Sequence, residues 1–144
     1  MKTYVLDASV ILKWVIGDAK EPDQGLAIRL LNTWMTGDLE LVAPALWKYE
    51  VGNFLGRQLP DNAIEKMDIL SDLQIRTIDL TSIMYRRCFE WMKTHGITFY
   101  DAAYLAVAYE FPGILVTADK KFVNKIHQPE HIRLLQDVEI VDYH

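Results

Sequence analysis

The sequence predicts an α/β domain of three layers, α/β/α, in which a central, mainly parallel sheet lies between helices. Short apolar segments typical of buried strands alternate along the chain with longer segments whose apolar residues recur at helical spacing. Because parallel strands need crossover connections, this alternation favours a parallel sheet with helices on both faces. The chain has 144 residues, the length of one ordinary domain, so we expect a single domain over residues 1–144.

The first strand covers Lys2–Leu6 and ends at Asp7, after which we expect a helix that continues to Val15. A turn at 22–25 begins a second helix, which stops at Gly37 because glycine readily adopts the backbone conformation that ends helices. Asp7 is therefore expected at the carboxyl end of a strand.

The second strand, 39–43, leads directly into the next predicted helix. Pro44 suits the first helical position, where no backbone N–H is needed, and the helix is expected to run to about Gln58. Glu50 then falls midway along this helix. A further helix begins at Pro60.

The second half of the chain continues the alternation. Asp101 falls in the first turn of an apolar, alanine-rich helix, and Asp119 follows the end of a continuous apolar strand. The expected elements are, in order, a strand at 75–78, a helix from about Ser82 to Gly96, a helix at 98–110, a strand at Ile114–Thr117, a short helix through Phe122 and Ile126, and a last strand at 139–141.

The net charge constrains the class of protein. A value of -5 argues against a generally basic nucleic-acid binder, while a local basic rim stays compatible with it. An acidic excess also arises where carboxylates gather to hold a divalent metal ion, whose charge the formal count omits.

The single cysteine, Cys88, cannot form an intrachain disulfide, and we expect it to be a buried apolar residue in a reducing, cytoplasmic setting. Asp7 and Lys13 interrupt the first apolar run, so we expect no signal peptide. The longest apolar run, 102–109, is too short to cross a bilayer, so no membrane association is expected.

Four acids from distant segments are predicted to meet. In an open parallel sheet the ligand site lies outside the carboxyl ends of the strands. Asp7 and Asp119 follow strands, and Glu50 and Asp101 lie on helices that leave the same edge. The alternative for Asp101 is a purely structural residue, because an acid in the first turn also stabilises the positive end of a helix.

Carboxylates that share one pocket repel one another unless cations neutralise them. Oxygen ligands without His or Cys select Mg²⁺ or Mn²⁺ rather than zinc, and a pair of such ions activates water and stabilises the leaving oxygen in phosphodiester hydrolysis. Ser9, Asn53 and Thr117 are predicted to support the acids by hydrogen bonding. The alternatives are a cap or turn contact for the two hydroxyls and a solvent-facing side chain for Asn53.

Four short segments carry the acids: Val-Leu-Asp-Ala-Ser-Val, Tyr-Glu-Val-Gly-Asn-Phe-Leu, Tyr-Asp-Ala-Ala-Tyr-Leu-Ala-Val-Ala and Val-Thr-Ala-Asp. In order and spacing they resemble the motifs of PIN-domain ribonucleases, most of all the VapC-type toxins, over nearly the whole chain. The resemblance assigns metal binding and catalysis to the four acids, and supporting positions to Ser9, Asn53 and Thr117. It also implies cleavage of single-stranded RNA, a homodimer, and an antitoxin protein that blocks the site.

One departure from the family follows Asp119. Some members carry a further acid there, whereas this chain continues with Lys120, Lys121 and the apolar and amide residues at 122–124. We therefore expect a second metal ion to be held weakly, or only with substrate. Lys120 and Lys121 are candidates for contact with RNA phosphate, and a solvated charged patch is the alternative.

Other functions fit the sequence less well. A phosphotransferase of the haloacid dehalogenase type needs a second Asp where Ser9 stands, and a receiver domain needs paired acids beside Asp7. A catalytically inactive PIN-like module that binds RNA or protein is the main alternative, which the presence of all four acids disfavours. His127 and His131 have the spacing of a zinc-binding pair, but Pro129 between them disrupts the helix that such a pair needs, so both are expected in exposed loops.

Two predicted helices, at 24–36 and 61–73, carry more apolar surface than a small sheet can cover, including Trp34 and Met67. They predict self-association into a homodimer and binding of a protein partner. The tryptophans lie at apolar helical positions and are expected mostly in the core, with one or two at an interface: Trp14, Trp34, Trp47 and Trp91.

Overall fold

The computed structural model of the chain describes residues 1–17, 21–128 and 130–140. Within these residues, parallel strands form one five-stranded sheet in the order β3-β2-β1-β4-β5. The predicted α/β class with a parallel sheet is confirmed. The strands are β1 (Lys2–Leu6), β2 (Leu39–Pro44), β3 (Arg76–Ile78), β4 (Ile114–Thr117) and β5 (Ile132–Leu134).

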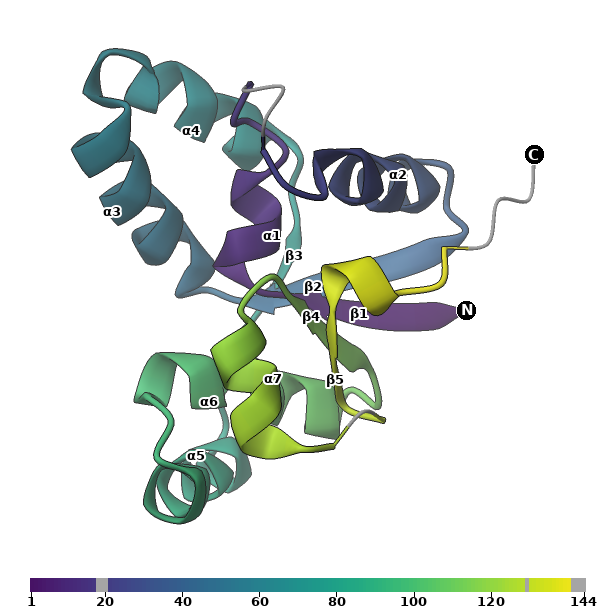
Figure 1. Cartoon of the computed structure of the whole chain (residues 1–144), viewed down its shortest axis with the longest axis vertical. Coiled ribbons are helices and arrows are strands. Elements are labelled where there is room, and N and C mark those ends of the chain that lie inside the picture. Colours follow the sequence, from purple (N-terminus) through teal and green to yellow (C-terminus); the bar gives the residue numbers. More distant parts are fainter. Residues whose placement is uncertain (18–20, 129, 141–144) are drawn as a thin grey trace.

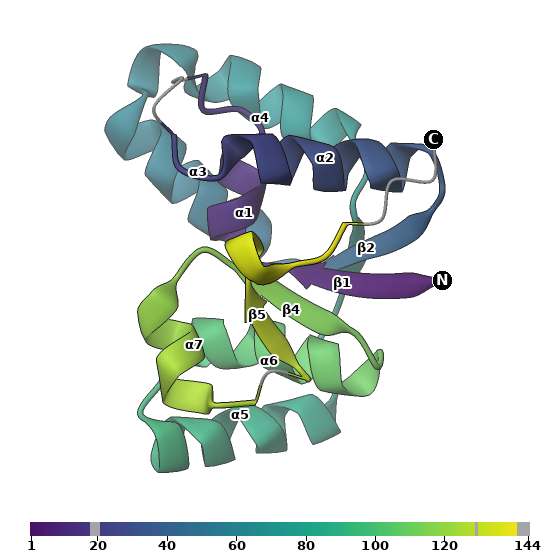
Figure 2. The same cartoon turned by 45° about the vertical axis from the view of Figure 1, so that its right-hand side comes forward.

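Helices cover both faces of the sheet, which gives the predicted three layers (Figures 1 and 2). One face carries α1 (Ala8–Leu12), α2 (Gln24–Met35), α3 (Trp47–Gln58) and α4 (Ala63–Asp72). The other carries α5 (Ser82–His95), α6 (Phe99–Glu110) and α7 (Lys120–Ile126). Two short 3-10 helices complete the described elements, η1 (Pro60–Asn62) and η2 (Leu135–Asp137).

The direction in which the strands are added reverses between β1 and β4. The chain builds outwards from β1 to β2 and β3, and then returns to place β4 and β5 on the other side of β1. In parallel sheets such a reversal opens a crevice at the carboxyl ends of the two central strands. Asp7 follows β1 and Asp119 closely follows β4, so the topology brings both acids to this crevice.

Helix α6 is the most deeply buried helix of the fold. All its residues from Ala102 to Ala108 are buried, as expected for a helix that is apolar nearly all round. The hydroxyl of Thr98 accepts a hydrogen bond from the backbone N–H of Asp101 and so caps the helix. Packing of α6 against β1, β2 and β4 therefore fixes the position of Asp101 in its first turn.

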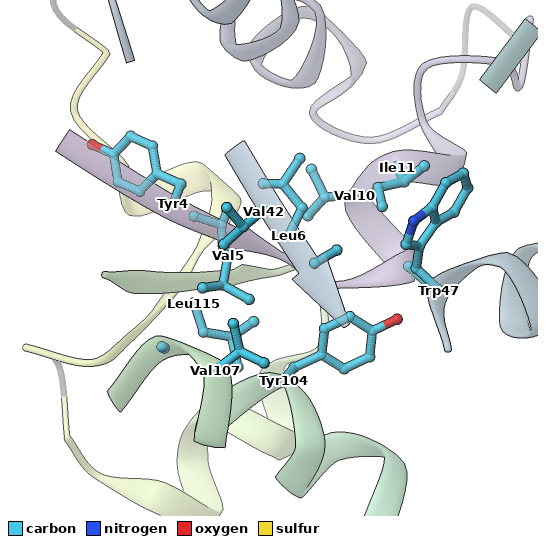
Figure 3. Packing of buried hydrophobic residues seen from close by; sticks show 14 of the residues in the cluster. Tyr4, Val5, Leu6, Val10, Ile11, Val42, Trp47, Tyr104, Val107 and Leu115 are labelled. Carbon is cyan, nitrogen blue, oxygen red and sulfur yellow. The ribbon is translucent and has the colours of Figure 1, made fainter. Parts of the chain in front are cut away.

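The core lies on both sides of the central strands (Figure 3). Val10 and Ile11 of α1 and Trp47 of α3 pack on one side, and Tyr104 and Val107 of α6 pack on the other. Among the tryptophans, Trp47 is fully buried and the other three are partly buried against this core, as predicted. Cys88 is also buried, and burial raises its pKa to about 11.

Two helix boundaries differ from the prediction. Helix α1 ends at Leu12 and not at Val15, because the next residues form tighter turns, in which the N–H of Lys13 bonds to Val10. Pro44 does not begin a helix but ends β2, where it pairs with Ile78 of β3. Helix α3 starts three residues later, so Glu50 lies in its first turn and not midway along it.

The last predicted strand is wrong. The strand that pairs with β4 is β5, in which Ile132 is aligned with Leu115. It occupies the edge of β4 that a strand at 139–141 would need. Glu139 and Ile140 form no strand, and Val141 lies outside the described residues.

Of the two histidines predicted to lie in exposed loops, only one is exposed. His127 is exposed and ends α7 with a positive φ of 56°. His131 is not an exposed loop residue, because its ring stacks on Tyr109 with 3.9 Å between the ring centroids and its Nδ1 is buried. Across the described residues, no helix combines the length and apolar character needed to cross a membrane.

Candidate active site

A cavity of about 410 Å³ opens at the carboxyl ends of β1 and β4. Its lining includes the four acids that the sequence analysis singled out: Asp7, Glu50, Asp101 and Asp119. Ser9 and Asn53 line it as well. The structure thus brings acids from four separate segments to one place, while their roles in metal binding and catalysis stay predictions.

Asp7 is held firmly in the turn between β1 and α1. The side chain is buried, and the hydroxyls of Ser9 and Thr117 both donate hydrogen bonds to its Oδ2, at 2.5 and 2.9 Å. Burial raises the pKa of this carboxyl, and the hydrogen bonds from Ser9 and Thr117 lower it only in part. The predicted supporting contacts of Ser9 and Thr117 to Asp7 are present in the structure.

The same two hydroxyls tie the β1–α1 turn to the β4–α7 turn. Ser9 Oγ accepts a hydrogen bond of 3.0 Å from the backbone N–H of Ala118. Thr117 Oγ1 accepts one of 3.1 Å from the backbone N–H of Asp119. The backbone of one acid is therefore positioned by the residues that hold the carboxylate of the other.

Asp119 itself is exposed and caps helix α7. Its Oδ1 accepts hydrogen bonds from the backbone N–H groups of Lys121 and Phe122, at 3.0 and 3.3 Å. Such a cap stabilises the start of a helix, so one carboxylate oxygen of Asp119 has a structural use in addition to its place in the cavity.

The charges of the three other acids all act on the ionisation of Asp101. Burial, followed by the charges of Asp7, Asp119 and Glu50, raises the pKa of Asp101 to about 7, against a smaller opposing effect of Lys125. Since Thr98 caps α6, the Asp101 carboxylate is not needed for that cap. Asp101 therefore lies within electrostatic range of each of the other three carboxylates.

Glu50 and Tyr104 form a second buried contact of the site. Burial, with a smaller contribution from the charge of Asp7, raises the pKa of Glu50, and the Tyr104 hydroxyl opposes this shift. Yet Glu50 Oε1 and the Tyr104 hydroxyl are both buried without a hydrogen-bond partner in the described residues, so their contact is a near approach and not a formed hydrogen bond. Figure 3 shows the Tyr104 ring extending from α6 towards the side on which Trp47 of α3 lies.

The sequence analysis missed Tyr104 as a site residue. Tyr104 stands three residues after Asp101, so both project from the same side of α6, and this spacing was the signal that would have found it. The sequence analysis gave this tyrosine no role of its own, and its ring packs in the core.

The α3 wall of the cavity carries three further residues that the sequence analysis missed, Phe54, Arg57 and Gln58. Asn53 does not orient Glu50 but accepts a hydrogen bond of 3.2 Å from Arg57 Nε. The predicted phosphate-binding residues, Lys120 and Lys121, are exposed at the start of α7 and do not line this cavity.

Four carboxylates in a lining without His or Cys suit Mg²⁺ or Mn²⁺ by their chemistry, and the unpartnered Oε1 of Glu50 is an oxygen that a cation would satisfy. The side chains are nevertheless not arranged as a finished ion site. Within the described residues, no three His, Cys, Asp or Glu side chains are placed to hold one ion. Shared binding of an ion by these acids therefore needs rotation of side chains, which the exposed Asp119 permits.

Comparison with known proteins identifies the family of this chain. The PIN domain family matches the chain over residues 4–126. Ribonuclease VapC3 of Pyrobaculum aerophilum is 27% identical over 124 residues, which cover 84% of this chain and 92% of that protein.

Solved structures share the fold at lower identity. VapC20 of Mycobacterium tuberculosis, described as a sarcin-ricin loop cleaving toxin, has a TM-score of 0.65 and 18% identity over 84% of this chain and 93% of its own. VapBC2 from Rickettsia felis, solved bound to a DNA fragment from its promoter, has a TM-score of 0.67 and 16% identity over 92% and 98%. With most of its length matched, and with the sheet order and layers described above, the chain belongs to the PIN domain family.

Proposed function

We propose that this protein is a Mg²⁺- or Mn²⁺-dependent endoribonuclease and the toxin of a toxin–antitoxin pair. The observation that carries the proposal is the convergence of four carboxylates on one cavity at the strand-order reversal of a PIN domain. The similarity to Ribonuclease VapC3 supports RNA as the substrate. Burial and the charges of the other three acids raise the pKa of Asp101, and a bound cation would neutralise those charges, which supports a cation requirement.

In this proposal Asp7, Glu50, Asp101 and Asp119 hold the metal. A bound divalent ion would activate water for attack on the scissile phosphorus and neutralise the negative charge that develops on the leaving oxygen. The contribution of the chain is to fix the ligands. Ser9 and Thr117 hold the Asp7 carboxylate.

The remaining acids are positioned by their own helices. Thr98 caps α6 and so places Asp101 at the mouth of the cavity, and the first turn of α3 brings Glu50 to its wall. Such fixed placement lowers the reorganisation needed when the reaction begins.

The deciding experiment is RNA cleavage by purified protein with and without chelator. We expect cleavage in Mg²⁺ or Mn²⁺, its loss in excess EDTA, and its recovery when the metal ion is restored. Asp101→Asn should be inactive, while Asp72→Asn, at an exposed position at the end of α4, serves as the matched control for loss of one negative charge. Cleavage that persists in EDTA would contradict the four-acid mechanism.

We also propose that the protein forms a homodimer and binds an antitoxin. Helices α2 and α4, which the sequence analysis selected, expose Met35, Ile64 and Ile69 at 66%, 73% and 50%. Further large apolar side chains are exposed on α5 and at the start of α6, which the sequence analysis did not anticipate: Ile83, Tyr85, Phe89, Met92 and Tyr100.

Two measurements test these partners separately. Light scattering at high concentration should give twice the mass of one chain, and a strict monomer would remove the dimer. Expression of the protein in cells should arrest growth, and co-expression of a small reading frame found beside its own should relieve the arrest. Arrest that no neighbouring product relieves would argue against the antitoxin.

A further inference from the structure

One helix contributes a continuous wall to the cavity. Glu50, Asn53, Phe54 and Arg57 of α3 all line it, and their spacing of three and four residues places them along one side of the helix. Glu50 lies at the end of this stripe that faces the other acids. The rest of the stripe extends the wall away from them, and no role has been given to Phe54 or Arg57.

Arg57 is a cation in the lining of a cavity that also holds four acids, and among the described residues it pairs with none of them. Its Nε donates to Asn53 Oδ1 at 3.2 Å, and within the described residues it makes no ion pair. The bond to Asn53 restrains the side chain, while the terminal NH₂ groups of the guanidinium keep their capacity to donate. This is the donor arrangement that binds phosphate oxygens in pairs.

Phe54 is much more exposed than its apolar neighbours on α3. Its neighbours Val51 and Leu55 are fully buried in the core, whereas Phe54 is 36% exposed at the cavity. An aromatic ring beside a phosphate-binding arginine is the combination that proteins use to bind unpaired nucleotides, by stacking on the base and pairing with the backbone.

We propose that Phe54 and Arg57 form the RNA-binding wall of this site, in which Phe54 stacks on an unpaired base and Arg57 binds a phosphate of the same strand. This inference rests on the proposed function and names the residues that select the substrate. A base inside a duplex cannot reach the Phe54 ring, so the wall selects unpaired RNA. Every base has a face that can stack, so the wall does not discriminate strongly between sequences.

The test is binding, measured without cleavage. In an Asp101→Asn background, the affinity for a short fluorescent poly-uridine RNA is measured by anisotropy for the parent and for Phe54→Ala, Phe54→Trp, Arg57→Ala and Arg57→Lys. Phe54→Ala should weaken binding about 5- to 100-fold, and Phe54→Trp should preserve it. Arg57→Ala should reduce the slope of log affinity against log salt by about 0.7, because one phosphate contact is lost.

The control variants are Tyr49→Ala on α3 and Arg86→Ala on α5. One removes an exposed aromatic ring and the other an exposed arginine, neither residue lines the cavity, and both variants should leave RNA binding unchanged. A duplex RNA of the same length should bind more weakly, and its affinity should not depend on Phe54.

The outcomes separate this inference from the proposed function. If the parent protein cleaves RNA while Phe54→Ala and Arg57→Ala bind and cleave it with unchanged affinity, KM and kcat, the RNA-binding role of these two residues is wrong and the proposed nuclease function is unaffected. If the parent never cleaves RNA but both variants lose binding to it, the RNA-binding role of Phe54 and Arg57 is supported and the nuclease function is not. If both variants bind RNA normally but fail to bind a protein partner, α3 is a protein interface and the inference is overturned.

Discussion

Asp7 and Asp119 both follow a central strand of the same sheet, but the turns that carry them differ. In the β1–α1 turn, Asp7 is 7% exposed, and its carboxylate accepts hydrogen bonds from two side-chain hydroxyls. In the β4–α7 turn the carboxylate is exposed and receives backbone N–H groups of the helix that it caps. Equivalent topological positions thus hold one fixed acid and one adaptable acid.

The difference follows from the residues around each turn. Asp7 lies in the middle of the sheet between β2 and β4, so nearby side chains surround it, and Thr117 reaches it from β4. Asp119 is followed by Lys120 and Lys121 on an open surface. We infer that Asp7 defines where a cation would bind and that Asp119 closes on it afterwards.

The largest effect is expected from removing the fixed acid. Asp7→Asn keeps an oxygen that accepts the Ser9 and Thr117 hydrogen bonds, so the fold should survive. Cleavage of RNA should fall by about 10³-fold or more, as when other charge-stabilising groups of active sites are removed. The rate of RNA cleavage and thermal unfolding should be measured on the same preparations. If Asp7→Asn kept activity within about tenfold of the parent, Asp7 would not define the site, and the distinction between a fixed and an adaptable acid would fail.

The next effect concerns the stability of the metal-free protein as a function of pH. In the folded state the pKa of Asp101 is raised to about 7, whereas the unfolded residue releases its proton near 3.8. Between these values the folded protein holds more protons than the unfolded chain, so the free energy of unfolding falls as pH rises. We expect Asp101 to account for about 1–2 kcal/mol of this loss, less than the full shift implies because solvent screens a partly exposed carboxyl.

Urea unfolding at pH 5 and pH 8 checks this prediction. Asp101→Asn should flatten the pH dependence, and Mg²⁺ should stabilise the parent at pH 8 more than at pH 5. If the metal-free parent is instead more stable at pH 8, repulsion among these acids does not control its stability.

The same comparison shows what the sequence reveals about the site. Asp7, Asp101 and Asp119 could be located from the sequence because each lies close to the end of an apolar strand or at the start of an apolar helix, and the predicted topology brings these points to one edge of the sheet. Phe54 and Tyr104 were not predictable in this way, because aromatic residues at apolar helical spacing agree with an ordinary core. Whether such a ring faces a cavity depends on the packing of α3 and α6, which no local pattern encodes.

The errors in the fold have a similar cause. Both Ile132–Leu134 and the residues at 139–141 are segments of three residues with two apolar members, and neither is long enough to define a strand by periodicity. Pairing with the free edge of β4 decides between them, and this is a tertiary property. Pro44 was assigned to a helix because proline suits both a helix start and a strand end, and pairing with Ile78 decides for the strand.

An intermediate effect is expected from the hydroxyl that links the two turns. Thr117→Val keeps the shape of the side chain but removes the donor to Asp7 and the acceptor for the Asp119 N–H. Metal affinity or cleavage should fall about 10- to 100-fold, which is typical for a group that orients a metal ligand. A double-mutant cycle with Asp7→Asn should be strongly non-additive, since the hydroxyl acts through that carboxylate. Additive losses would mean that Thr117 acts through Asp119 alone.

The smallest effect on stability, and the sharpest test of the adaptable acid, is expected at Asp119. Asparagine caps helices about as well as aspartate, so Asp119→Asn should change the free energy of unfolding by only a few tenths of a kcal/mol. Asp119→Ala removes the hydrogen bonds from the backbone N–H groups of Lys121 and Phe122 and should lower the free energy of unfolding by about 1 kcal/mol. Both variants should show a smaller Mg²⁺-dependent rise in melting temperature than the parent, because both lack the carboxylate charge. Thermal unfolding therefore separates the two roles of Asp119. The melting temperatures without Mg²⁺ report on the helix cap and should differ between the two variants. The rise in melting temperature on adding Mg²⁺ reports on metal binding and should be smaller in both variants than in the parent. If Asp119→Asn responds to Mg²⁺ as the parent does, the exposed carboxylate is a helix cap only, and any ion is held by Asp7, Glu50 and Asp101.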